Sequence, residues 1–272
     1  MRQLRIAALA VVIVLAFGGC ATNPSGRSQM LLIGDAQVNQ MGLTAFNQMK
    51  ASDKLSNDPA KQRYAECVTR AIVAQLDPAW RQLPWEVAVF NHTAANAFAL
   101  PGGKVGVHTG LLKVATTPDE LAAVIGHEIA HVTHRHGAER ISQGMAAEVA
   151  MAATQAYVGR KQSPEEARTA LALLGVGAQI GVMLPFSRLH EREADVAGQM
   201  LMVKAGFDPQ AAVSLWEKMH AADPARPPQW LSTHPDPEQR RESLAARVNE
   251  LRNLRDAAVT RPDCTVPSGS AP

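Results

Sequence analysis

Residues 119–136 read DELAAVIGHEIAHVTHRH, and this stretch decides the fold and the chemistry that the sequence indicates. Its apolar residues recur at the three- and four-residue spacing of an amphipathic helix, and they are Leu121, Val124, Ile125, Ile129 and Val132. Pro118 suits the start of such a helix, and Gly137 suits its end. The stretch therefore predicts a helix whose apolar face packs into a core.

The motif HEIAH, residues 127–131, lies on this helix and indicates a catalytic metal site. His127 and His131 are four residues apart, so both imidazoles share one helix face and can bind one ion. Zinc polarises a carbonyl and lowers the pKa of a coordinated water to about 7, which suits hydrolysis of peptide bonds at neutral pH. Glu128 lies beside the ligands and can take the proton of that water. The motif thus predicts a zinc-dependent peptide hydrolase.

A third zinc ligand is expected in the segment SRLHEREAD, residues 187–195. Two histidines and one glutamate form an established catalytic zinc set with one position open for water. Glu191 is the favoured choice on this basis. Glu193 and His190 remain open alternatives, because the sequence does not give the rotation of the helix.

The N-terminus resembles the export signal of a bacterial lipoprotein. Two arginines precede the apolar run at residues 6–17, and LAFGGC ends at Cys20 in the manner of a lipobox. We expect residues 1–19 to be removed as the signal peptide, Cys20 to carry the lipid, and residues 20–29 to form a polar tether. In such lipoproteins an aspartate after the cysteine favours the inner membrane. Ala21 therefore indicates the outer membrane, facing the periplasm.

The balance of charge argues against nucleic acid as a partner. The chain has 27 Lys and Arg against 25 Asp and Glu, and loss of the two arginines in the signal would leave equal numbers. Nucleic-acid binding normally requires clustered positive charge.

Cys67 and Cys264 remain besides Cys20. An even pair of cysteines in an exported protein predicts a disulfide between them. This bond would tie the C-terminal tail, residues 261–272, to an early helix.

The rest of the sequence predicts an α+β fold that is mainly helical. WEVAVF, NAFAL and KVGVHTG have β-type composition and are separated by turn residues, which predicts a small antiparallel sheet over the HEIAH helix. About 250 residues suit one well-buried core, so residues 30–260 are expected to form a single domain. Further helices are expected at about residues 30–50, 59–76, 138–159, 164–184, 188–205, 209–222 and 236–258.

Four motifs in one order resemble a known protein family: NAFALPGG (96–103), HEIAH (127–131), SRLHEREAD (187–195) and STHP (232–235). Together they are similar to zinc metallopeptidase family forty-eight, which includes heat-shock proteases and CAAX prenyl proteases. The resemblance implies a gluzincin-type fold with one zinc ion per chain. The lipobox makes the chain most similar to the small periplasmic lipoprotein peptidases of that family.

The resemblance assigns His127, His131 and Glu191 as zinc ligands and Glu128 as general base and acid. Asp195 lies four residues after Glu191 and is expected to accept the N–H of a liganding imidazole.

His234 lies in a loop that the family places near the zinc, and two roles remain open for it. It would donate a hydrogen bond to the oxyanion of the tetrahedral intermediate, or it would cap the zinc until the loop moves.

Asn96, Ala97 and Phe98 are implied as substrate-binding residues, because an extended peptide can add to their strand. A purely structural role is equally open for Phe98. His134 and His136 are expected to be solvated at the end of the HEIAH helix.

Two functions follow from these observations. The first is a lipid-anchored zinc metalloendopeptidase that hydrolyses misfolded or misassembled cell-envelope proteins. The alternative is a chaperone-like envelope assembly factor that uses the same cleft, with proteolysis rare or gated by His234. The expected partners are unfolded or extended polypeptides, the membrane through the lipid anchor, and other proteins of envelope assembly or quality control.

Overall fold

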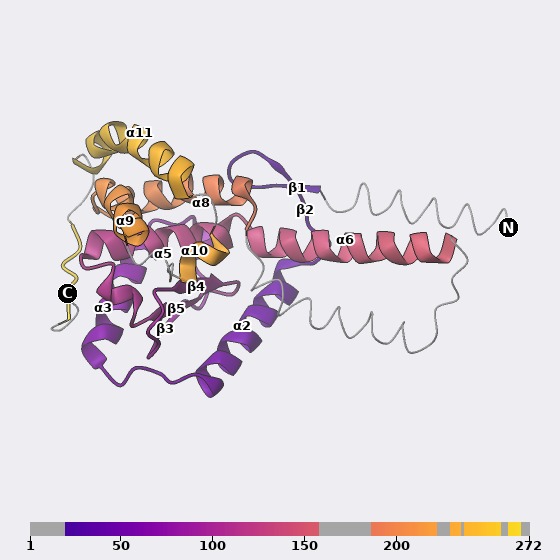
Figure 1. Cartoon of the computed structure of the whole chain (residues 1–272), viewed down its shortest axis with the longest axis horizontal. Helices are drawn as coiled ribbons and strands as arrows, with labels where there is room; N and C mark the ends of the chain where they lie inside the picture. Colours follow the sequence, from indigo (N-terminus) through magenta and orange to yellow (C-terminus); the bar gives the residue numbers. More distant parts are fainter. Residues whose placement is uncertain (1–19, 158–185, 222–228, 235–236, 257–260, 268–272) are drawn as a thin grey trace.

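The computed structural model describes residues 20–157, 186–221, 229–234, 237–256 and 261–267. The expected signal peptide and the helix expected at residues 164–184 lie outside these residues. Figure 1 shows a mainly helical molecule with a small sheet at its centre, which confirms the predicted α+β class.

Helix α5 (Pro118–Thr133) is the centre of the fold and carries the HEIAH motif. Thr117 caps its first turn by accepting a hydrogen bond from the backbone N–H of Glu120, whose carboxylate accepts one from the N–H of Thr117 in return. The residues from Asp119 to Thr133 are buried, because α5 packs against α8 (Arg188–Lys204) on one side and the sheet on another. The predicted helix is confirmed.

Two glycines bring α5 and α8 unusually close together. A Cβ atom built on Gly126 would lie 2.8 Å from the carbonyl oxygen of Gly198, and one built on Gly198 would lie 2.7 Å from the backbone nitrogen of His127. Any larger residue would push the helices apart. This close crossing places the HEIAH motif beside the carboxylates of α8.

Helix α5 ends at Thr133 and not at Gly137, the stop that the sequence suggested, and the turn that follows it contains Arg135. Arg135 adopts a left-handed backbone conformation with φ of 54°. Its guanidinium pairs with Asp35 and lies over the ring of Trp80, and these contacts stabilise an unfavourable conformation for a residue with a Cβ atom. Gly137 lies in the first turn of the next helix, α6 (His136–Tyr157).

The central sheet has three strands, β3 (Glu86–Phe90), β4 (Ala97–Leu100) and β5 (Lys104–His108), in the order β3-β5-β4. β4 and β5 form the expected antiparallel hairpin, whose turn uses Gly102 and Gly103 at positive φ. β3 pairs with β5 in parallel, so the sheet is mixed and not wholly antiparallel as predicted. The reason is that the chain reverses direction after β3 and again after β4, so β5 runs in the direction of β3, and β5 lies next to β3 in the sheet.

The segment expected as a polar tether folds against the domain. β1 (Cys20–Thr22) and β2 (Ser28–Met30) form an antiparallel hairpin that lies near the first turn of α6 in Figure 1. Asn23 and Gln29 are buried there, with 3% and 2% of their surface exposed. Asn23 and Gln29 therefore bond to the domain instead of to solvent.

The remaining elements surround α5 and the sheet. They are α2 (Asp35–Ser52), α3 (Pro59–Val73), α4 (Pro78–Arg81), η1 (Leu111–Lys113), α9 (Gln210–Ala221), α10 (Gln229–Thr233) and α11 (Pro237–Asp256). Helices α3, α9 and α11 enclose the largest apolar cluster together with α5, and α2 covers the other side of the sheet. Among the described residues, no helix combines the length and the apolarity needed to cross a membrane.

A disulfide joins Cys67 of α3 to Cys264, across 197 residues of sequence. Cys264 is buried in the main apolar cluster, so the segment 261–267 is held against the domain. The predicted disulfide and the predicted attachment of the C-terminal tail are confirmed.

Candidate metal centre

Helix α5 presents the side chains of HEIAH at a buried site. His127, Glu128 and His131 each expose 3% of their surface. The Nε2 atoms of His127 and His131 lie 3.0 Å apart, because residues four apart share one helix face. The two imidazoles thus point their nitrogens at one place.

Helix α8 adds Glu191 to this place. Ser187 caps α8 by accepting a hydrogen bond from the N–H of His190, and Glu191 follows in the first turn. The carboxylate oxygens of Glu191 lie 3.4 Å from His127 Nε2 and 3.5 Å from His131 Nε2. Of the three candidates that the sequence left open, Glu191 meets the histidines of the motif, whereas the side chains of Glu193 and His190 contact Glu139, Arg27 and His136.

His234, which follows α10, completes a group of four. Its Nδ1 atom lies 3.2 Å from His127 Nε2 and 3.0 Å from Glu191 Oε1. One nitrogen or oxygen from each of His127, His131, Glu191 and His234 lies within 4.8 Å of the other three. The Nε2 atom of His234 also lies 3.3 Å from Glu128 Oε1, so the ring stands between the ligand atoms and the expected base.

Asp195 and Arg240 hold this group from outside. Asp195 Oδ1 lies 3.0 Å from His127 Nδ1, which leaves Nε2 of the same ring facing the other ligand atoms. Arg240 bonds both oxygens of Asp195 at 2.7 Å and Glu191 Oε2 at 2.6 Å, and its guanidinium lies over the ring of Trp216. The contact of Asp195 is the one expected from the sequence. Arg240 was not recognised there, because the motif STHP gives no sign of a buried arginine six residues after His234.

Trp230 of α10 was also not recognised in the sequence. Its indole N–H donates a 2.7 Å hydrogen bond to Glu128 Oε1, and its ring stacks on His234 at 4.7 Å between centroids. The base and His234 are therefore oriented by one side chain.

The carboxylates of Glu191 and Asp195 favour a positive charge on the groups that face them. Burial lowers the pKa of His127, but hydrogen bonds with Asp195 and Glu191 outweigh it and raise that pKa to about 9. Burial would raise the pKa of Glu191, yet the neighbouring His234, His127 and Arg240 hold it well below its usual range. Burial and the neighbouring His127 lower the pKa of His131. The carboxylate of Glu191 thus stays ionised at neutral pH, as a metal ligand must.

The donor set of this group fits zinc. Imidazole nitrogens and a carboxylate oxygen are the ligands that zinc takes at catalytic sites, and no cysteine is present among the four residues. The group could therefore hold a zinc ion, as the sequence predicted.

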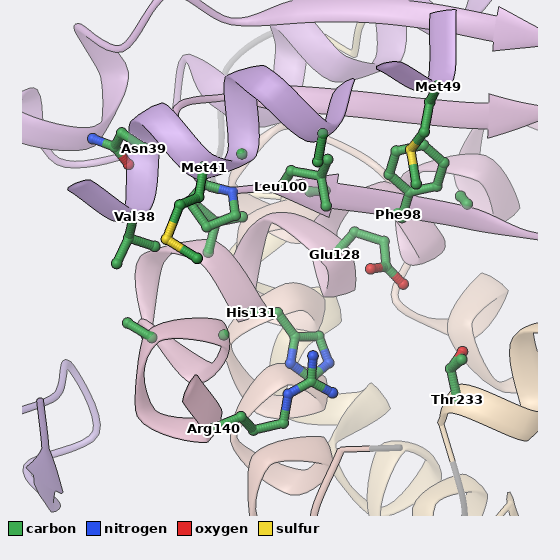
Figure 2. A pocket seen from close by; sticks show the side chains of 18 of the residues that line it. Val38, Asn39, Met41, Met49, Phe98, Leu100, Glu128, His131, Arg140 and Thr233 are labelled. Carbon is green, nitrogen blue, oxygen red and sulfur yellow. The ribbon is translucent and has the colours of Figure 1, made fainter. Parts of the chain in front are cut away.

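A groove of about 750 Å³ opens onto Glu128 and His131. Figure 2 shows Met41 and Met49 of α2 close to Leu100 and Phe98 of β4, with the two motif residues below them in this view. Asn96 and Ala97 also line it, together with Thr233 and His234. The three residues expected to bind substrate thus lie along the same groove as the expected base.

The expectation that His134 and His136 are solvated is wrong. They expose 5% and 0% of their surface, because α6 starts directly after α5 and folds the end of the motif helix inward. His136 contacts His131 and Glu193 instead of water.

Comparison with known proteins agrees with this geometry. A family model described as peptidase family M48 matches residues 59–248. The beta-barrel assembly-enhancing protease of Escherichia coli (strain K12) is 32% identical over 233 residues, which cover 84% of this chain and 47% of that protein. The mitochondrial metalloendopeptidase OMA1 of Schizosaccharomyces pombe is 38% identical over 180 residues, which cover 65% of this chain and 50% of that protein.

A bovine relative extends the match over most of the chain. The mitochondrial metalloendopeptidase OMA1 of Bos taurus is 29% identical over 266 residues, which cover 91% of this chain and 48% of that protein. The chain thus spans about half the length of the curated relatives that it matches.

Proposed function

This chain belongs to peptidase family M48, and we propose that it is a zinc-dependent endopeptidase in which His127, His131 and Glu191 hold the ion. The convergence of these ligand atoms beside Glu128, at the floor of a groove, carries the proposal. When bound, zinc would polarise the scissile carbonyl and acidify water. The residues of the chain supply the binding, the orientation and the proton transfers described below.

Glu128 is the proposed general base and acid. It lies next to the proposed ligand His127 in sequence and lines the groove, so it can take the proton of a water molecule at the ion. The hydrogen bond from Trp230 fixes one carboxylate oxygen and so fixes the direction in which the other points. Asp195 and Arg240 hold His127 and Glu191 in place, and neither is among the described residues that line the groove.

The proposed substrates are extended or unfolded polypeptides. β4 is an edge strand of the sheet and lines the groove, so a peptide can pair with its backbone while Phe98 and Met49 contact the side chains. The flexible, polarisable methionines of α2 suit side chains of different shapes. Selection would therefore depend more on an extended backbone than on one sequence.

His234 is proposed to cap the zinc in the resting state. Its Nδ1 atom belongs to the converging group, and its ring stands between that group and Glu128. Cleavage then requires His234 to move away from the ligand atoms, which gates the activity. On this account a His234→Ala variant cleaves an unfolded substrate faster than the wild type and binds zinc more weakly. A slower variant with unchanged zinc affinity would favour oxyanion stabilisation instead.

The place of action is proposed to be the bacterial cell envelope. LAFGGC supports a lipid on Cys20 after removal of residues 1–19, and Ala21 supports the outer membrane facing the periplasm. The relative from Escherichia coli is named as a protease that enhances beta-barrel assembly, which supports quality control of misfolded or misassembled envelope proteins, with assembly proteins as partners. Residues 30–260 would act as one metallopeptidase domain.

A single substitution tests the enzymatic proposal. Glu128→Gln keeps the ligands and removes the base, so it is expected to retain one zinc ion per chain and to lower kcat/KM on an unfolded polypeptide by about 10²–10⁴-fold. Zinc content by mass spectrometry and cleavage of a fluorescent casein measure the two effects. A variant that cleaves at the wild-type rate would rule out Glu128 as the base.

A further inference from the structure

A second buried group of polar residues touches the metal centre from the side of the N-terminus. We propose that Glu193 and His136 are positioning residues, which fix the tautomer and the ring orientation of the ligand His131, and that Arg27 holds Glu193 in place. The proposal rests on the metal-binding role proposed for His131. We call the group formed by Asn23, Arg27, Gln29, His136, Glu139, His190 and Glu193 the N-terminal polar cluster.

A chain of contacts leads from Glu193 to the ligand. His136 Nε2 lies 2.9 Å from Glu193 Oε2, and His136 Nδ1 lies 2.9 Å from His131 Nδ1. His136 has no exposed surface, and His131 exposes 3% of its surface, so water does not compete for these atoms. On the other side of His131, Nε2 faces His127 and Glu191.

These contacts determine where the protons lie. A hydrogen bond between two nitrogens needs one N–H and one lone pair. His131 must offer the lone pair of Nε2 to the metal, so its proton is on Nδ1 and His136 Nδ1 accepts it. His136 then carries its own proton on Nε2 and donates it to Glu193. The carboxylate of Glu193 therefore sets the tautomers of both histidines.

Glu193 is itself held by the hairpin that follows Cys20. Arg27 Nε donates to Glu193 Oε1 at 2.8 Å, and Arg27 Nη2 donates to Oε2 at 3.0 Å. Asn23 Nδ2 donates to Oε1 at 3.0 Å. Such charge-assisted hydrogen bonds fix the plane of the carboxylate. The expected tether is thus linked to a metal ligand through Arg27, Glu193 and His136.

Glu139 provides a matched comparison within the same cluster. It accepts hydrogen bonds from Nη1 and Nη2 of Arg27 at 2.8 and 2.7 Å, as Glu193 does from Nε and Nη2. Its histidine neighbour is His190, whose Nε2 lies 3.0 Å away, and not His136. Glu139 and Glu193 expose 4% and 9% of their surface. Loss of either charge thus disturbs the same guanidinium, but only Glu193 bonds to the histidine that contacts His131.

The first test reads the tautomers directly in the wild-type protein. Long-range ¹H–¹⁵N correlation spectra of the zinc-loaded, ¹⁵N-histidine-labelled chain are expected to show His131 protonated on Nδ1 and His136 protonated on Nε2. Assignment uses the spectra of His136→Gln and His190→Gln. A His136 ring protonated on Nδ1 would overturn the proposal, and this test does not depend on any variant of Glu193 folding.

The second test compares Glu193→Gln with Glu139→Gln. An amide at position 193 can donate to His136 Nε2 and so reverse the tautomers, which places a proton on His131 Nε2 against the metal. We expect Glu193→Gln to weaken zinc binding about 10–100-fold, as measured by competition with a chromophoric chelator, and Glu139→Gln to leave it unchanged. The melting temperatures of the two metal-free variants should fall by similar amounts.

The outcomes separate this inference from the proposed function. Equal zinc affinities of Glu193→Gln and Glu139→Gln, with tight binding by the wild type, would overturn the positioning role alone. A wild-type protein that binds no zinc would overturn the proposed function and this inference with it.

Discussion

The metal centre and the N-terminal polar cluster are two buried groups of histidines and carboxylates that lie side by side, yet they are built differently. In the N-terminal polar cluster the guanidinium of Arg27 lies between the two carboxylates and donates to both. In the metal centre, Arg240 bonds Asp195 and one oxygen of Glu191, while the three imidazole nitrogens still face one another at 3.0 and 3.2 Å.

This difference shows what distinguishes a buried metal site from a buried network of ion pairs. Buried carboxylates need a partner of opposite charge, and either a side chain or an ion can provide it. Arg27 satisfies its cluster from within the chain. The metal centre has Arg240 on one side of Glu191 and also brings imidazole nitrogens of three histidines to the same carboxylate, a group that could hold a metal ion as well. His136 and His131 join the two groups, which lets the first orient the second.

Removal of Arg240 or of Arg27, each in its own variant, is expected to give the largest difference in stability between the metal centre and the N-terminal polar cluster. Arg240→Met leaves Glu191 and Asp195 buried without their cation, which should lower the free energy of unfolding of the metal-free protein by about 3–5 kcal/mol. Zinc supplies a replacement charge, so it should stabilise Arg240→Met more than the wild type. Arg27→Met should lose less, because the side chain of Arg27 is 24% exposed, and zinc should stabilise it less than the wild type.

Urea unfolding with and without saturating zinc measures these differences. The contrast between the metal centre and the N-terminal polar cluster would be wrong if zinc stabilised both variants more than the wild type, or both less than the wild type.

Loss of the disulfide is expected to destabilise the fold and to leave the contacts of the metal centre and of the N-terminal polar cluster unchanged. The bond closes a segment of 197 residues, and removal of a native disulfide typically lowers stability by about 2–4 kcal/mol. Cys67→Ala combined with Cys264→Ala should therefore melt at a lower temperature and bind zinc with unchanged affinity. Weaker zinc binding at a temperature where the variant is fully folded would show that the site depends on overall stability, and would weaken the other comparisons.

Substitution of Gly198, where α5 and α8 cross, is expected to lower stability less than the preceding changes and to weaken zinc binding at the metal centre. The methyl group of Gly198→Ala would meet the backbone of His127, and such overpacking lowers stability by about 1–3 kcal/mol. The shift separates His127 from Glu191, so zinc affinity should fall. Gly144→Ala, where a Cβ atom meets no neighbour within 4 Å, is the matched control on another helix. Equal zinc affinity of the two variants would contradict the role of the crossing.

Most of the fold could be predicted from local patterns in the sequence. The spacing of apolar residues predicted α5, α8, α9 and α11 to within a few residues, because one face of each helix is buried. The direction of β3 was not predictable, since it depends on the order in which strands pair and not on their composition. The conformation of Arg135 was not predictable either, because its stability comes from contacts with Asp35 and Trp80, which are distant in sequence.

The grouping of His127 and His131 could be predicted, because residues four apart share one helix face. The choice of Glu191 over Glu193 and His190 came from the family resemblance, and the structure brings Glu191 to the two histidines. The residues around these three could not be predicted. Trp230 and Arg240 lie 102 and 49 residues from the groups that they hold, Glu128 and Glu191, and no spacing rule links them. His134 and His136 were predicted to be solvated, because a His-rich helix end is usually exposed. The structure buries both, because the chain turns directly into α6.

Anomalous diffraction at the zinc edge from crystals of the zinc-loaded protein tests the central claim most directly. The account predicts one strong peak per chain, among His127, His131 and Glu191, and none in the N-terminal polar cluster. No peak among these three residues, or a peak between Glu139 and Glu193, would contradict it.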